Sequence, residues 1–330
     1  MTAYRLFGAE TSPYSVKVRS FLRYKGVEFE WVGRSKATDE EFAALARVPT
    51  VPLLLSPNRP ANQDSTSILA TVEADHAEPT AVPDDPACAA LALILEDYAD
   101  EWLNKLMFFN HWGQKPDREL AGDRTMEQLL DGDLPRAKKK TRDQIIKRMR
   151  DRLPLVGIEK ENEKTLKPSF ERFFTLLNSH LEQSLFLFGG RPSAADFAVA
   201  GQVAQLLLDP TPGDWLRANA PFVTAWSEFM EAPKAGGPFK PLSELEATLL
   251  PLFKDEVAVT YLPWAKANMA AAEAKEERVA LKLDGKAYEQ ITQHYAARAF
   301  KSVNKAATAA KDAPGLQDFL TAAGAGEVFA

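Results

Sequence analysis

Apolar residues in the first eighty positions follow strand-like and helix-like spacings in turn. A short apolar strand is predicted over residues 4–7. The helix predicted after it has apolar residues at a spacing near 3.6, namely Val16, Val18, Phe21, Leu22 and Tyr24. Residues 51–55 form a second apolar run, and another helix is predicted over residues 65–74. This alternation favours an α/β domain over residues 1–80.

The pattern becomes helical after a proline- and acid-rich segment, residues 75–87, which is typical of a linker. Helices are predicted from residue 88 onward, including 164–184 and 193–208, and a domain boundary is predicted near Gly236-Gly237-Pro238. The remaining tail predicts one helix over residues 242–274, a hairpin turning at Asp284-Gly285, and a helix over residues 294–311. We therefore expect an all-α domain over residues 88–235 and a mixed α/β extension over residues 236–330.

Three short segments of the first domain suggest a ligand site. Ser12 is a natural helix cap with Pro13 at the first helical position, and a helix N-terminus favours a bound anion. Pro52, after Val51, stands where a cis bond would expose neighbouring backbone groups to an extended peptide. Gln63, Asp64 and Ser65 precede another helix, where a carboxylate and a hydroxyl could hold an amino-acid end.

Simpler roles for the same residues stay open. Ser12 can be a helix cap without chemistry, and Ser15, Tyr14 or Tyr4 can supply a hydroxyl group instead. Asp64-Ser65 can be a plain cap as well. Ser193 and Asp196 have the spacing of a capping box, which is a structural feature.

In their order and separation these segments resemble the glutathione transferase family. Ser12 matches the catalytic serine of the serine-type classes, Pro52 the cis-proline, and Asp64-Ser65 the contact to the γ-glutamyl end. Residues 187–197 are similar to the capping signature of the family's second domain. The resemblance covers about 235 residues and implies a thioredoxin-like N-terminal domain, an all-α C-terminal domain, and glutathione as co-substrate. It also implies a hydrophobic small molecule as second substrate and a homodimer.

The second substrate of the family lies between the two domains, which here corresponds to residues 98–112. Five candidates for its site are Tyr98, Trp102, Phe109, His111 and Trp112. The alternative is that these aromatic residues form an ordinary helix–helix core, with His111 as a buried, hydrogen-bonded histidine.

Composition excludes several other functions. The net charge of −6 over 330 residues disfavours binding to nucleic acid or to an anionic membrane, and we read the basic run at residues 136–152 as a solvated helix face. The single cysteine, Cys88, lies outside the first helix, and this argues against thiol–disulfide exchange. We expect Cys88 to be a small buried residue of a later helix. No residue spacing suggests a metal site, and the cytoplasm is the simplest compartment.

The sequence therefore predicts an enzyme that adds the glutathione thiolate to a hydrophobic electrophile. The alternative is a non-catalytic scaffold with the same fold that binds glutathione, another ligand or a partner. The role of the extension is not predicted.

Overall fold

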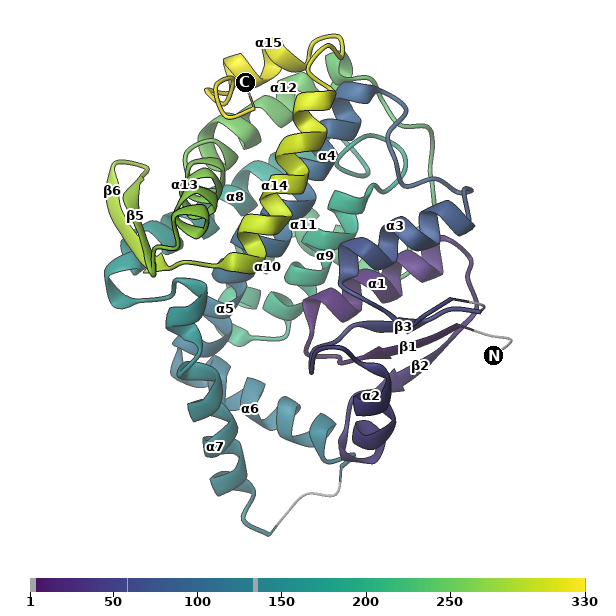
Figure 1. The fold of residues 1–330 in the computed structure, drawn as a ribbon, viewed down its shortest axis with the longest axis vertical. Helices are drawn as coiled ribbons and strands as arrows, with labels where there is room; N and C mark the ends of the chain where they lie inside the picture. The colour runs from purple at the N-terminus through teal and green to yellow at the C-terminus, as the bar shows by residue number, and fades with distance from the viewer. Residues whose placement is uncertain (1–3, 58, 133–135, 330) are drawn as a thin grey trace.

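The structure, a computed structural model, describes residues 4–57, 59–132 and 136–329. An α/β domain, a helical domain and a C-terminal extension follow one another along the chain (Figure 1). The thioredoxin-like and all-α parts confirm the predicted fold class, and the extension contains both helices and a two-stranded sheet.

The α/β domain has a four-stranded sheet of order β2-β1-β3-β4. Its strands are β1 (Tyr4–Gly8), β2 (Phe29–Gly33), β3 (Leu53–Leu55) and β4 (Asn62–Gln63), and only β1 and β2 run parallel to each other. Side chains alternate across the sheet, so Leu6 faces helices α1 (Pro13–Tyr24) and α3 (Ser65–Asp75), and Phe7 packs on Phe42 of α2 (Asp39–Leu45). The sheet therefore has a helical layer on each face.

The helical domain begins at α4 (Pro86–Asp97), where the Asp85 side chain accepts the N–H of Ala87 at 2.8 Å. A π-helical turn, Tyr98–Leu103, joins α4 to α5 (Asn104–Gly113). The other helices of this domain are α6 (Lys115–Leu129), α7 (Lys138–Arg150), α8 (Glu163–Leu181), α9 (Ala194–Leu207), α10 (Pro210–Asn219) and α11 (Pro221–Phe229). Helix α9 packs against α1 and α4, so it connects this domain to the first.

The extension folds back over the helical domain. It contains α12 (Leu242–Leu252), α13 (Tyr261–Ala274), β5 (Arg278–Leu283), β6 (Lys286–Ile291), α14 (His294–Ala309) and α15 (Leu316–Ala322). The hairpin is confirmed, with Asp284 and Gly285 both at positive φ, as a two-residue turn of this type requires. Helix α14 lies along α13 and α4 and covers the seam between α3 and α4 (Figure 1).

The prediction of one continuous helix over residues 242–274 was wrong. The chain forms α12, a π-helical turn at Phe253–Val257, and then α13 after a break at residues 258–260. Pro263 has no backbone N–H, and it lies in the first turn of α13, where a backbone N–H has no partner within the helix. Helix α15 was not predicted.

No helix among the described residues is both long enough and apolar enough to cross a bilayer.

The capping box at the start of α9 connects this helix to the preceding loop. Asp196 accepts hydrogen bonds from the backbone N–H and hydroxyl of Ser193, at 2.8 and 2.7 Å, and from the N–H of Leu187 at 2.8 Å. All of these groups are buried. The carboxylate therefore satisfies donors that water cannot reach.

Replacing Asp196 by alanine is expected to lower the free energy of unfolding by about 3 kcal/mol, because two buried N–H groups lose their acceptor. Chemical denaturation followed by circular dichroism measures the change. The control is Asp214→Ala, which removes an exposed ion pair with Arg217 and should change the stability by less than about 0.5 kcal/mol. Equal stabilities of the two variants would contradict the assignment.

Candidate functional site

A cavity of about 890 Å³ lies where the α/β domain, the helical domain and the extension meet. We call it the main cavity. The α/β domain contributes the predicted residues Tyr14, Val51, Pro52, Gln63, Asp64 and Ser65 to its lining. The helical domain contributes Asp100, Glu101, Asn104 and Lys105, and the extension contributes Gln293, Tyr295 and Arg298.

The loop before β3 has a cis peptide bond between Val51 and Pro52. The side chain of Gln63 binds the backbone of this loop: its Oε1 accepts from the N–H of Arg47 at 2.7 Å, and its Nε2 donates to the carbonyls of Val48 and Thr50, each at 2.9 Å. Gln63 was predicted to contact glutathione. In the structure its amide holds the loop that carries Val51 and Pro52, and Gln63 also lines the main cavity.

The three hydroxyl groups that the sequence suggested for catalysis have different surroundings at the start of α1. Ser12 caps the helix by accepting the Ser15 N–H at 3.2 Å, which leaves its own hydroxyl proton available. Tyr14 lines the main cavity but donates its hydroxyl to the carbonyl of Asp100 at 2.8 Å. Ser15 is fully buried. Ser12 is half-buried and lies two residues before the cavity-lining Tyr14.

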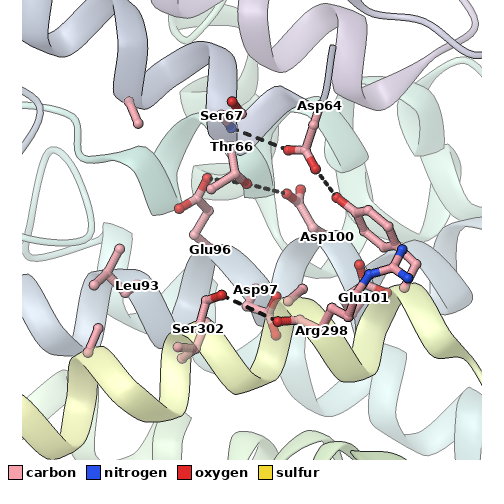
Figure 2. A pocket seen from close by; sticks show the side chains of 15 residues that line it. Asp64, Thr66, Ser67, Leu93, Glu96, Asp97, Asp100, Glu101, Arg298 and Ser302 are labelled. Atoms are coloured by element: carbon pink, nitrogen blue, oxygen red, sulfur yellow. Dashed lines mark hydrogen bonds between the residues drawn. The ribbon is translucent and has the colours of Figure 1, made fainter. Parts of the chain in front are cut away.

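Asp64 connects the first domain to the extension. It has φ 85°, caps α3, and accepts the Ser67 N–H through Oδ1 at 3.3 Å. Its Oδ2 accepts the hydroxyl of Tyr295 on α14 (Figure 2). The adjacent Ser65 lines the cavity at the N-terminus of α3.

A second cavity, of about 460 Å³, lies between α3, α4 and α14. Figure 2 shows the side chains that line it. Five residues line both cavities: Asp64, Asp100, Glu101, Tyr295 and Arg298. The hydrogen bond between Tyr295 and Asp64 therefore lies at the boundary between the two cavities.

A buried lysine joins the two walls of the site. Lys17 on α1 donates to Glu96 and to Asp100, with both distances 2.7 Å. Burial alone lowers the pKa of Lys17, but Asp100 and Glu96 raise it above its usual value. Burial raises the pKa of Asp100 to about 6 although Lys17 opposes the shift. This ion cluster ties the helix of the proposed thiol site to the end of α4.

The aromatic residues predicted to bind the second substrate do not line either cavity, and this prediction was wrong. Tyr98 and Trp102 are fully buried and pack against Tyr261, Trp264 and Tyr288 of the extension.

The other three candidates also pack within the helical domain. Phe109 packs against the main core, and Trp112 packs beside Ala121 and Ile146. His111 is bonded to Asp209 at 2.5 Å. The alternative that these residues form core is thus the correct one, because the extension covers Tyr98 and Trp102 and other residues of the helical domain cover the remaining three.

The polar face of the same segment lines the main cavity instead. Sequence reasoning missed Glu101, Asn104 and Lys105. Asn104 and Lys105 follow Glu101 by about one helical turn, so the three share one face of the segment. Sequence reasoning also missed Tyr295, whose position depends on how the extension folds back.

Comparison with known proteins agrees with this fold. Residues 6–80 match the family description "Glutathione S-transferase, N-terminal domain", and residues 146–229 match "Glutathione S-transferase, C-terminal domain". The chain belongs to the glutathione S-transferase family. A probable glutathione S-transferase, GSTU6, of Oryza sativa subsp. japonica is 28% identical over 124 residues, which span 36% of this chain and about half (52%) of the rice protein.

The chain is also similar, at low sequence identity, to solved structures. β-Etherase LigF from Sphingobium sp. strain SYK-6 is 21% identical with a TM-score of 0.51, and the alignment covers 70% of this chain and 96% of LigF. A glutathione S-transferase of Methylobacterium radiotolerans JCM 2831, solved with glutathione sulfonate, is 22% identical with a TM-score of 0.44 over 72% and 96% of the two chains.

Cys88 is a structural residue of the helical domain. Its side chain is fully buried in α4, and burial raises the pKa of the thiol to about 12. The described residues contain no cluster of histidine, cysteine and acidic side chains that could hold a metal ion.

Replacing Lys17 by methionine should destabilise the protein by about 3–5 kcal/mol at pH 8, since two buried carboxylates lose their cation. Their pKa values then rise in the folded state, where Asp100 already has a pKa near 6. The folded state would bind more protons than the unfolded chain, so stability falls with rising pH and the loss is smaller at pH 5.5. Urea denaturation at both pH values measures this difference.

Lys147→Met is the matched control, because Lys147 forms an exposed i,i+4 pair with Asp151 and should contribute less than about 0.5 kcal/mol. A loss in Lys17→Met as small as in the control, or one that does not vary with pH, would contradict the role assigned to the cluster.

Proposed function

We propose that this protein binds glutathione in the main cavity and adds its thiolate to an electrophile. The observation that supports the proposal most strongly is the convergence of three distant segments on one cavity. The cis Val51–Pro52 loop and the Asp64–Ser65 start of α3 line this cavity, and the start of α1 reaches it through Tyr14.

Each segment fits one part of glutathione. The amino-acid end of glutathione carries an ammonium and a carboxylate. Asp64 binds the ammonium, and Ser65 at the N-terminus of α3 binds the carboxylate. The backbone of Val51 pairs with the extended peptide. The thiolate accepts a hydrogen bond from the hydroxyl of Ser12 at the N-terminus of α1.

The energetics of thiolate stabilisation are within the reach of this arrangement. A free thiol has a pKa of about 8.5, and lowering it by ~2 units corresponds to about 2.7 kcal/mol. One hydrogen bond to a charged group together with the helix dipole can supply this amount.

The electrophile is bound against the wall formed by Asp100, Glu101, Asn104 and Lys105. This wall is polar, so we expect an electrophile that carries polar groups, whereas the sequence predicted a hydrophobic one.

The homodimer implied by the family resemblance is retained as a proposal. The seam between α3 and α4 is covered by α14 of the same chain, so a dimer has to use other surfaces of the two domains.

Titration calorimetry with reduced glutathione tests binding, and Asp64→Asn tests the site. The asparagine side chain can still accept the N–H of Ser67, but it lacks the negative charge that pairs with the ammonium of glutathione. The affinity for glutathione should therefore fall by about tenfold or more. Asp84→Asn, in the exposed linker, should bind like the unchanged protein. Binding without turnover of 1-chloro-2,4-dinitrobenzene would favour the non-catalytic scaffold, and the absence of binding would contradict the proposal.

Ser12→Ala should raise the pKa of the thiol of bound glutathione by about 1–2 units, because one donor to the thiolate is lost. Thiolate absorbance measured against pH reports this pKa. Ser15→Ala is the matched control, since the Ser15 hydroxyl is fully buried and should leave the titration unchanged. An unchanged titration in Ser12→Ala would remove Ser12 from the mechanism, and an effect of Ser15→Ala alone would transfer the role.

A further inference from the structure

One carboxylate in the main cavity differs from its neighbours in having no bonded partner. Glu96 and Asp100 accept hydrogen bonds from Lys17, and Asp97 accepts one from the hydroxyl of Tyr261. Glu101, next in the chain, is half-buried and lines both cavities. Within the described part of the chain, its carboxylate makes no hydrogen bond and no ion pair.

Lys105 lies one helical turn after Glu101 and also lines the main cavity. Its ammonium donates to Oε1 of Gln293 at 2.8 Å and to the carbonyl of Val156 at 3.3 Å, and it lies 4.0 Å from the ring centroid of Trp264. These three partners are neutral, and the nearby group of opposite charge is the Glu101 carboxylate, which makes no hydrogen bond to Lys105.

The environment of the pair favours proton transfer near neutral pH. Burial raises the pKa of Glu101 to about 7, with Lys105 opposing and Asp100 and Asp64 adding to the shift. Burial lowers the pKa of Lys105 to about 7. The titratable or charged groups around Glu101 are Lys17, Asp64, Asp97, Asp100, Lys105, Tyr295 and Arg298. A carboxylic acid of this kind is partly protonated at neutral pH and can donate its proton.

We propose that Glu101 is the proton donor to an electrophile on which attack by the glutathione thiolate places negative charge on an oxygen atom. This class comprises epoxides and α,β-unsaturated carbonyl compounds. The inference rests on the proposed function, because the thiolate must be bound at the opposite wall of the same cavity. It assigns to Glu101 a contact with the second substrate, which its free carboxylate and its position in the cavity allow.

The reaction balances without a redox partner. With an epoxide, the sulfur–carbon bond forms, the carbon–oxygen bond breaks with its electron pair on oxygen, and this oxygen takes the proton of Glu101. With an unsaturated carbonyl compound, the π electrons of the carbon–carbon double bond move toward the carbonyl oxygen, which is protonated to an enol that then becomes the ketone. The Glu101 carboxylate formed in either case lies near the Lys105 ammonium. It is reprotonated, through solvent water, by the proton that the glutathione thiol released on forming the thiolate.

Substrate comparison in Glu101→Gln tests the assignment. Styrene oxide represents the epoxides, trans-4-phenylbut-3-en-2-one the unsaturated ketones, and 1-chloro-2,4-dinitrobenzene a substitution in which chloride leaves without a proton. We expect kcat/KM to fall by about a hundredfold with one or both oxygen electrophiles and to fall far less with the aryl chloride, whose reaction needs no proton donor. The substrate whose kcat/KM falls shows whether epoxides or unsaturated carbonyl compounds are the class that Glu101 serves. Glu246→Gln, an exposed glutamate on α12, should leave all three rates unchanged.

A solvent isotope effect in the unaltered protein tests the same step without a variant. At saturating glutathione, the oxygen electrophile should react roughly twofold or more slowly in D₂O, whereas the aryl chloride rate should change little, because only the first involves proton transfer to oxygen. Equal isotope effects for the oxygen electrophiles and the aryl chloride would overturn the inference. An equal loss of all three activities in Glu101→Gln would overturn it as well.

The outcome distinguishes this inference from the function on which it rests. Turnover of the aryl chloride with no selective effect of Glu101→Gln on either oxygen electrophile would contradict only the role of Glu101. Absence of glutathione binding in the unaltered protein would contradict the proposed function, and the role of Glu101 with it.

Discussion

The buried ion cluster of Lys17, Glu96 and Asp100 is the interaction on which the site depends. It joins α1, which carries the proposed thiol site, to the end of α4, where the wall of the main cavity begins. Charges taken out of water are costly unless they are paired, so the two walls must meet at the separation that keeps both 2.7 Å contacts. The carbonyl of Asp100 also accepts a hydrogen bond from the Tyr14 hydroxyl. This second contact between α1 and the segment after α4 restricts rotation of one relative to the other.

The extension completes the cavity by controlling which face of residues 98–112 is turned toward it. Tyr261, Trp264 and Tyr288 pack on Tyr98 and Trp102, and the burial of these large rings favours this arrangement strongly. Once the aromatic face is covered, the opposite face with Glu101, Asn104 and Lys105 lines the cavity. The polarity of the site is therefore a consequence of core packing on the far side of the same helical segment.

The sequence predicted those parts of the fold that local chemistry determines. Pro13 and Ser12 mark the start of α1, Asp284-Gly285 suits the hairpin turn, and Ser193 with Asp196 forms the capping box as expected. The residues of the α/β wall could be predicted for the same reason. The helical wall could not, because aromatic residues at helical spacing are compatible with a core and with a pocket. Only the position of the extension decides between them, and that position depends on contacts between residues more than 150 positions apart, such as Tyr98 with Tyr261.

The contact between Tyr295 and Asp64 bears on how glutathione could enter. A carboxylate offers about four acceptor positions, and in the structure two are used, one by the Ser67 N–H and one by the Tyr295 hydroxyl. An ammonium group can therefore bind Asp64 without displacing Tyr295. The ligand would then lie between the α/β wall and α14, so its binding energy would also hold the extension against the first domain. By this argument the extension is part of the binding site, since it donates to the same carboxylate that is proposed to recognise the γ-glutamyl end.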